Sequence, residues 1–310
     1  MILTLSIIGG LIILFFIALL IIYLMVFYSP HKKQNDIYNI PNASQYNEHR
    51  KVMEKNIAEI EKIPYETVQI KSYDGLTLYG KYYHVKDGAP IDICMHGYRG
   101  TAERDMNGGF NLSREYGRNL LLCDQRAHGK SQGHTLTFGI KERFDVVSWA
   151  NYLTERFGKD CRILLVGVSM GATTVLMASG EKLPQTVKGV LADCPYSKPE
   201  QIIKKVCKDI KCSPKLFYPL IRLSARLFGR FSLTETSAEE QVKKATVPIL
   251  VLHGGDDRVV PCHMSEKIAE NSTLVERHVF ERAGHALCFY ADNKKYREVV
   301  DKFREKVFSD

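Results

Sequence analysis

The chain has 310 residues, of which 45% are hydrophobic and 25% charged, values that are ordinary for a globular protein. This length allows one large α/β domain with a small addition. The formal net charge is +8, but no Gly-rich phosphate loop, zinc-finger pattern or RNA-binding aromatic signature accompanies it, so we expect no nucleic-acid partner. The charge favours an anionic membrane surface, and a solvated basic face without a partner fits equally well.

Eight cysteines are scattered along the chain, and none forms a C-x-x-C pair. Cys207 and Cys212 lie close together, but no nearby His or Cys completes a zinc set. The pattern therefore predicts free thiols in a reducing compartment, and no metal site.

The first element is an uncharged apolar run from Ile2 to Tyr28, which is long enough to cross a bilayer as a helix. A cleaved signal peptide has a shorter apolar core, a basic start and a small-residue cleavage site, which Tyr28-Ser29-Pro30 does not provide. We therefore predict a transmembrane anchor over residues 1–28, rather than a signal peptide or a buried core helix. Lys32 and Lys33 follow at once, and the positive-inside bias places the rest of the chain on the cytosolic side.

Residues 29–64 are polar, and we predict a linker that continues into a short helix over 46–62. A globular domain is predicted over 65–310. It begins with two strands, 67–71 and 76–84, joined as a hairpin across the D-G turn signal at Asp74-Gly75.

Beyond this hairpin, short apolar strands alternate with helices. Such alternation predicts an α/β fold with a mostly parallel sheet and helices on both faces, to which the hairpin adds an antiparallel edge. The strands are expected at 90–95, 119–123, 162–168, 187–193, 249–253 and 274–280, and the helices at 102–116, 140–157, 170–179, 262–270 and 293–308.

Residues 196–246 interrupt the alternation with two basic amphipathic helices, predicted at 199–211 and 214–230. An insertion at this point would cover the carboxyl ends of the strands, where ligands bind in open α/β sheets. We predict a helical cap that shapes an apolar acyl pocket and can open. The alternative is two helices that pack on the domain as ordinary core.

A candidate nucleophile lies in Gly167-Val168-Ser169-Met170-Gly171, which is a G-x-S-x-G pattern between a predicted strand and a predicted helix. The tight turn leaves no room for a Cβ at either glycine, and it holds Ser169 in a strained conformation with its hydroxyl exposed. The following helix directs backbone N–H groups at the same place, where a developing negative charge can be held.

A serine nucleophile needs a histidine to take its proton and a carboxylate to hold that histidine. His285 is the candidate base, because it follows the last predicted strand at the same sheet edge and Gly284 lets the backbone bend there. The loop after strand 249–253 contains both Asp256 and Asp257, and the residues alone do not choose between them.

Acyl transfer also needs donors for the oxyanion, and we predict two backbone N–H groups. The Met170 N–H is fixed by the serine turn. The Tyr98 N–H is the second, because Gly97 frees the backbone to aim it. His96 is predicted to be a structural hydrogen-bonding residue rather than a second base.

Together these motifs resemble the serine hydrolases of the α/β-hydrolase superfamily, close to bacterial membrane-anchored esterases and to lipase-like or serine-aminopeptidase-like members. The resemblance extends from about residue 67 to the C terminus, and it is highly specific for the superfamily but barely specific for the substrate. It is carried by HGYRG at 96–100, DQRAHGKS at 124–131, GVSMG at 167–171, HGGDDRVVP at 253–261 and GH at 284–285.

The resemblance implies an α/β-hydrolase fold with the triad acid at Asp257, the position of the Asp in the family's H-G-x-x-D-x-x-V-P pattern. It also implies that Asp124, Arg126 and His128 brace a loop rather than react. Ala127 stands in that loop where the family usually has Gly.

The implied activity is hydrolysis of a small carboxylic ester through an acyl-enzyme, without a metal or an organic cofactor. A peptidase, a thioesterase or an acyltransferase could use the same residues, and a non-catalytic binding module is a further alternative. An aminopeptidase would need carboxylates in the cap to hold a free amine, and the cap is basic apart from Glu235, Glu239 and Glu240 near its end.

Overall fold

A central sheet of eight strands organises the computed structural model, which describes residues 2–30 and 36–309. The strand order is β1-β2-β4-β3-β5-β6-β7-β8. The hairpin β1–β2 is antiparallel and pairs antiparallel with β4, and the remaining pairs are parallel. The strands are β1 (Glu66–Lys71), β2 (Thr77–Tyr83), β3 (Ile91–Met95), β4 (Asn119–Asp124), β5 (Ile163–Val168), β6 (Val187–Asp193), β7 (Ile249–Gly254) and β8 (Val275–Phe280).

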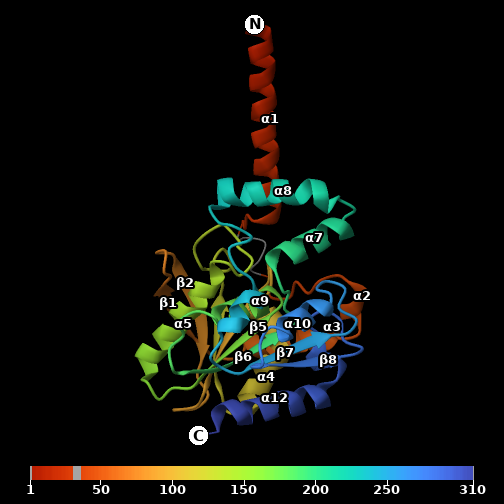
Figure 1. Cartoon of the computed structure of the whole chain (residues 1–310). Helices are drawn as coiled ribbons and strands as arrows, with labels where there is room; N and C mark the ends of the chain where they lie inside the picture. The colour runs from red at the N-terminus through yellow and green to blue at the C-terminus, as the bar shows by residue number, and fades with distance from the viewer. Residues whose placement is uncertain (1, 31–35, 310) are drawn as a thin grey trace.

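The predicted α/β architecture is confirmed, and each strand begins and ends within one residue of its expected bounds. Helices cover both faces of the sheet (Figure 1). The main helices are α4 (Ala102–Glu115), α5 (Glu142–Phe157), α6 (Met170–Ala178), α10 (His263–Ala269) and α12 (Asn293–Phe308), and shorter ones are α9 (Ala238–Gln241), η2 (Val242–Lys244) and α11 (Cys288–Ala291).

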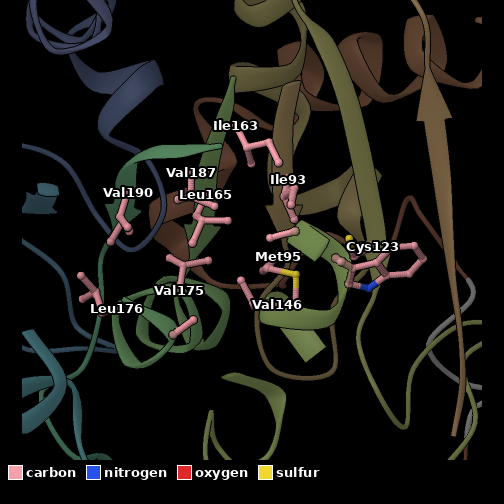
Figure 2. Close-up of a cluster of buried hydrophobic side chains, with 14 of the residues drawn as sticks. Ile93, Met95, Cys123, Val146, Ile163, Leu165, Val175, Leu176, Val187 and Val190 are labelled. Carbon is pink, nitrogen blue, oxygen red and sulfur yellow. The ribbon is translucent and has the colours of Figure 1, made fainter. Parts of the chain in front are cut away.

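The inner parallel strands β3 to β7 are buried on both faces, as their continuous apolar runs require, whereas the edge strand β8 is only partly buried. In β5, Ile163 and Leu165 face the helices α5 and α6, whereas Leu164 faces α12 on the other side. Figure 2 shows the first of these clusters, in which the strand residues meet Val146 of α5 and Val175 of α6. This packing holds β5 in its place in the sheet and therefore determines the position of the turn that follows it.

Residues 36–64 fold onto the domain rather than crossing open solvent. They contain α2 (Ser44–Asn47) and α3 (Arg50–Glu61), whereas we predicted a linker with one helix over 46–62. Helix α3 packs against α4, and its Ile57 and Ile60 are fully buried. The apolar residues that make this contact are spaced along one face of a mostly polar segment.

The segment that we predicted as a cap forms α7 (Pro199–Asp209), α8 (Pro214–Ser224) and a π-helical turn η1 (Ala225–Gly229). Helix α8 lies across the foot of α1 (Ile2–Val26), and α1 extends away from the domain (Figure 1). The last turns of α1 pack on α8, where Tyr23 and Phe27 join the buried side chains of α7 and α8.

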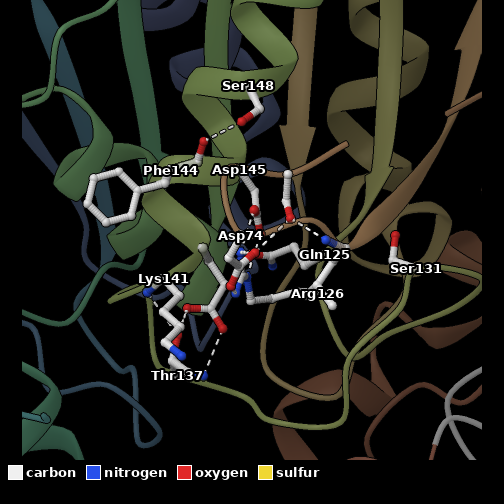
Figure 3. Close-up of polar contacts among 12 residues, drawn as sticks. Asp74, Gln125, Arg126, Ser131, Thr137, Lys141, Phe144, Asp145 and Ser148 are labelled. Atoms are coloured by element: carbon white, nitrogen blue, oxygen red, sulfur yellow. Dashed lines mark hydrogen bonds and ion pairs between the residues drawn. The ribbon is translucent and has the colours of Figure 1, made fainter. Parts of the chain in front are cut away.

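One buried arginine joins three parts of the sheet's carboxyl end (Figure 3). Arg126, in the loop after β4, binds both carboxylate oxygens of Asp145 on α5 at 2.6 and 2.7 Å. It also binds both oxygens of Asp74, in the β1–β2 turn, at 2.9 and 3.1 Å. Losing one partner of such a buried pair costs about 3–5 kcal/mol, so Arg126 is placed to brace this loop.

Candidate active site

The turn between β5 and α6 places Ser169 at the carboxyl edge of the sheet in a strained conformation, with φ 57° and ψ −117°. Non-glycine residues adopt such angles only where the surroundings enforce them, and often at functional sites. A Cβ at Gly171 would lie 2.0 Å from the Met95 carbonyl oxygen, and one at Gly167 would lie 2.3 Å from the Gly171 carbonyl oxygen. The turn can therefore form only with glycine at both positions.

The structure brings together Ser169, His285 and Asp257, which come from the loops after three different strands. His285 Nε2 lies 2.9 Å from Ser169 Oγ, and His285 Nδ1 lies 2.7 Å from Asp257 Oδ2. If Nδ1 carries the proton that Asp257 accepts, Nε2 is free to accept the serine proton. The geometry is that of a nucleophile, a base and an orienting acid.

Asp257 is held on both of its carboxylate oxygens. Oδ1 accepts hydrogen bonds from the backbone N–H groups of Val259 and Val260, both at 2.8 Å. Burial raises the pKa of this carboxyl, but the charge of His285 and the hydrogen bonds from His253 and His285 outweigh burial and hold the pKa well below its usual range. Asp256 is exposed to solvent, so the structure separates the two carboxylates that the residues alone left equivalent.

The loop after β3 lies beside the serine. A Cβ at Gly97 would come within 3.3 Å of Ser169 Cβ, and the Gly97 N–H is already donated to Asp105 Oδ2 at 2.7 Å. In the described part of the chain, the N–H groups of Tyr98 and Met170 donate to no other protein atom. Both are therefore available to a ligand oxygen.

His96 is fully buried beneath this loop and is engaged on both ring nitrogens. Its Nδ1 lies 2.8 Å from the Gly97 carbonyl oxygen, and its Nε2 accepts the Gln125 N–H at 3.3 Å. His128 in turn accepts the Arg99 N–H at 3.1 Å. Through these contacts both histidines support the loop, and neither lies beside the serine hydroxyl.

A pocket of about 260 Å³ opens at the serine. We expected residues 196–246 to shape it, but none of the described residues that line it comes from that segment. One wall is formed instead by residues 41–53, which precede the sheet. The lining residues are Pro41, Ala43, Gln45, Tyr46, Met53, Gly97, Tyr98, Arg104, Asp105, Asn107, Val168, Ser169, Val259, His285, Ala286 and Tyr290.

The wall over 41–53 is the part of the site that sequence analysis missed. Gln45 Oε1 accepts the His285 N–H at 3.4 Å, and Tyr46 and Met53 are buried against Leu287. The available signal was the spacing of Ile40, Tyr46 and Met53, which places apolar side chains toward one side of the segment. The polar residues between them concealed it.

Three potential metal ligands, Cys194, Asp257 and His285, place one donor atom each within 4.8 Å of the others. A thiol binds a metal as its thiolate, and burial raises the pKa of Cys194 well above its usual value. Asp257 and His285 already satisfy one another at 2.7 Å. The chemistry of this donor set fits a proton relay better than a metal site.

Asp193, at the end of β6, is a second carboxyl beneath the serine turn and was not singled out in the sequence. Its carbonyl oxygen accepts the Ser169 N–H at 2.9 Å, and its side chain is buried. The pKa of Asp193 is raised to about 6, because burial raises it more than the hydrogen bond with the Cys288 thiol lowers it. An acidic residue at the end of an apolar strand was the signal that could have identified it.

Comparisons with known proteins agree with this architecture. The family model described as the alpha/beta hydrolase fold matches residues 93–215, and the model described as serine aminopeptidase matches residues 220–292. The uncharacterized protein YqkD of Bacillus subtilis is 26% identical over 234 residues, which cover 73% of this chain and 75% of YqkD. The uncharacterized protein YfhR of Salmonella typhimurium is 26% identical over 257 residues, covering 79% and 82%.

Solved structures share the fold at low sequence identity. The Pyrococcus furiosus esterase Pf2001 has a TM-score of 0.65 and 22% identity, with 86% of this chain and 96% of that chain covered. Est1E from Butyrivibrio proteoclasticus, solved with ferulic acid bound, has a TM-score of 0.61 and 20% identity, covering 78% and 100%. The Pyrococcus horikoshii acylaminoacyl peptidase has a TM-score of 0.58 and 17% identity, covering 81% and 43%.

The buried Asp193 carboxyl predicts a pH-dependent stability. The pKa of Asp193 is raised from 3.8 to about 6 in the folded state, so the folded protein favours the protonated carboxyl. The stabilisation from this group is therefore complete below about pH 3.8 and is lost as the pH rises through 6. Such a shift is worth about 3 kcal/mol. Asp193→Asn should therefore gain up to this amount over the unchanged protein between pH 4 and pH 8, measured by urea unfolding in detergent.

The exposed Asp256→Asn variant is the control, because its stability should follow the pH profile of the unchanged protein. Parallel profiles for Asp193→Asn and the unchanged protein would contradict the raised pKa.

Proposed function

The chain belongs to the α/β-hydrolase superfamily, and on that premise we propose that it is a serine hydrolase that cleaves carboxylic esters through an acyl-enzyme at Ser169. The observation that carries the proposal is the chain of contacts from Ser169 Oγ to His285 at 2.9 Å and from His285 to Asp257 at 2.7 Å. Fold membership alone would leave the reaction open, because function depends on the residues of the site.

In the first half of the reaction, Ser169 Oγ attacks the ester carbonyl carbon and its proton passes to His285 Nε2. The carbonyl oxygen becomes an oxyanion that accepts hydrogen bonds from the Tyr98 and Met170 N–H groups. When the carbonyl re-forms, the bond to the alcohol oxygen breaks, and that oxygen takes the proton from His285. Asp257 stays ionised throughout and stabilises the positive charge on His285, as its low pKa allows.

In the second half, His285 Nε2 takes a proton from a water molecule, and the water oxygen attacks the acyl carbon. The same two N–H groups hold the second oxyanion. The bond from carbon to Ser169 Oγ then breaks, the serine oxygen recovers its proton from His285, and the carboxylic acid leaves.

The pocket favours a small ester as the substrate. Its volume of about 260 Å³ is below the range of about 300–1,000 Å³ that is usual for drug-sized ligands, so we expect a short acyl group. Two of the three cap carboxylates that an aminopeptidase could use are engaged elsewhere, since Glu235 pairs with Arg143 at 2.9 Å and Glu239 pairs with Lys198 at 2.9 Å, and no described residue of that segment lines the pocket. This supports an ester over a peptide with a free amine.

We also propose that α1 is a retained transmembrane anchor. Its apolar span Thr4–Val26 has 23 residues with a mean hydropathy of 3.1, and an α-helix of that length extends about 35 Å, enough for a hydrocarbon core of about 30 Å. A core helix would be buried, whereas Ile13 and Leu14 are each 62% exposed. Signal cleavage after the apolar run would remove Phe27, which is fully buried in the domain.

The orientation of this anchor is the second part of the proposal. Lys32 and Lys33, on which the cytosolic placement rests, lie outside the described residues. The eight cysteines are all free thiols, which suits a reducing compartment.

Ser169→Ala tests the nucleophile. Membranes that contain the unchanged protein should be labelled by a fluorophosphonate probe and should hydrolyse short-chain p-nitrophenyl esters, and both activities should be lost in Ser169→Ala. Ser213→Ala, at an exposed serine, should retain both. Persistent labelling of Ser169→Ala would refute this nucleophile, and serine-dependent cleavage of aminoacyl amides without ester cleavage would refute the substrate class.

Asp257→Asn and Asp256→Asn form a matched pair of neighbouring amides. Asp257→Asn should lower kcat by about 10⁴, because an amide no longer holds the histidine in the reactive tautomer. Asp256→Asn should stay within about twofold of the unchanged enzyme, since an exposed surface change seldom alters the site. Steady-state ester kinetics decide the matter, and similar losses in the two variants would contradict the assignment of the acid.

The anchor should keep the intact chain in the membrane pellet after an alkaline carbonate wash, with a mass that includes residues 1–28. A soluble, shortened chain would indicate a cleaved signal instead. For orientation, a membrane-impermeant maleimide should reach the partly exposed Cys161, Cys212 and Cys262 only after cells are permeabilised. Labelling in intact cells would overturn the cytosolic placement.

A further inference from the structure

We propose that the end of α1 is a positioning element of the active site: Tyr98 and Arg99 use its last carbonyl groups to hold the loop that presents the Tyr98 N–H. The inference rests on the proposed role of that N–H in ester hydrolysis. It assigns to the anchor helix a task in catalysis besides attachment.

Three hydrogen bonds join the loop after β3 to the end of α1 and to Tyr28 just beyond it. The Tyr98 hydroxyl donates to the Val26 carbonyl oxygen at 2.8 Å. Arg99 Nη2 donates to the carbonyl oxygens of Met25 at 2.8 Å and Tyr28 at 3.0 Å. The last four carbonyl groups of a helix have no partner within it, and a cation near that end is favourable. The loop therefore supplies partners that the helix end lacks.

The backbone at Arg99 needs such support. Its φ is 50°, in the left-handed region that bulky side chains rarely adopt. The Arg99 N–H donates to His128 Nε2 at 3.1 Å, which fixes the loop on the domain side. A strained conformation persists only where several contacts enforce it, and the side-chain bonds to Met25 and Tyr28 are the contacts from the other side. If they were lost, relaxation at Arg99 would re-aim the adjacent Tyr98 N–H.

The same helix end belongs to the hydrophobic cluster in which the side chains of both donor residues pack. The Tyr98 ring lies 5.4 Å from that of Phe138, which lies 5.9 Å from that of Phe27. Met170, whose N–H is the other candidate donor, is buried in the same cluster as Tyr23 and Phe27. The end of α1 is thus part of the packing around both positions from which an oxyanion would be held.

Tyr98→Phe and Arg99→Ala remove the hydrogen bonds but keep the Tyr98 N–H. With the full chain in detergent micelles, each should lower kcat for a short p-nitrophenyl ester by about tenfold, less than the 10²–10³ that follows loss of a whole donor. KM should stay within about twofold, because the interaction strengthens in the transition state. Arg99→Lys, which keeps one charged donor, should recover part of the loss.

Thr186→Val is the matched control. It removes the hydrogen bond of 2.7 Å between Thr154 Oγ1 and Thr186 Oγ1, which lies before β6 at the amino end of the sheet, away from α1 and from the loop after β3. Its kcat should equal that of the unchanged protein, although its melting temperature should fall by an amount similar to that of Tyr98→Phe. A loss of kcat in Thr186→Val that matches the loss in Tyr98→Phe would overturn the proposal, because it would reflect stability alone.

A trifluoromethyl ketone gives a readout that a merely structural role would not change. Ser169 Oγ adds to the ketone carbon, the serine proton passes to His285, and the ketone oxygen becomes an oxyanion that mimics the transition state. Its inhibition constant should rise in Tyr98→Phe and Arg99→Ala in proportion to the loss of kcat/KM. Unchanged inhibition together with unchanged kcat in both variants would overturn the positioning role. An active Ser169→Ala would instead refute the proposed function, so the two failures are distinguishable.

Discussion

The site depends on how closely the turn after β5 approaches the end of β3. The main chain at Gly171 passes so near the Met95 carbonyl oxygen that a Cβ would lie 2.0 Å from it. This contact locks the start of α6 beneath the loop after β3 and sets Gly97 against Ser169. The parallel packing of β3 beside β5 makes the approach possible, since it brings their carboxyl ends to one edge. The loops that contain Asp257 and His285 emerge at that same edge.

The sequence was sufficient for features whose physical cause is local. Continuous apolar runs such as 163–168 predict buried parallel strands, and the two glycines around Ser169 predict the turn. The order of Ser169, Asp257 and His285 along the chain could be read in the same way. Whether these side chains meet depends on loop packing, which a linear pattern does not contain. Asp256 could be set aside only because Asp257 occupies the acid position of the family pattern, or because Asp256 is exposed in the structure.

Features that depend on contacts between distant segments could not be predicted. Residues 41–53 read as a polar linker and the start of a short helix, because their apolar side chains become a buried face only when they meet Leu287. The basic helices 199–209 and 214–224 read as a pocket cover, because amphipathic spacing shows that a face is buried but not what buries it. That face packs partly on the end of α1, a contact between residues about 200 positions apart in the chain.

The pocket wall and the groups of the proposed reaction come from different parts of the chain. The groups of the proposed reaction and their supports come from the ends of β3, β5, β6, β7 and β8, whose positions the sheet dictates. The wall at 41–53 lies on a segment before the sheet, where Gln45 Oε1 accepts the His285 N–H at 3.4 Å. Substitutions in that wall can alter the shape of the pocket without disturbing the strained turn. Evolution can therefore reshape this pocket by changing a short external segment, while the residues at the strand ends are inherited intact.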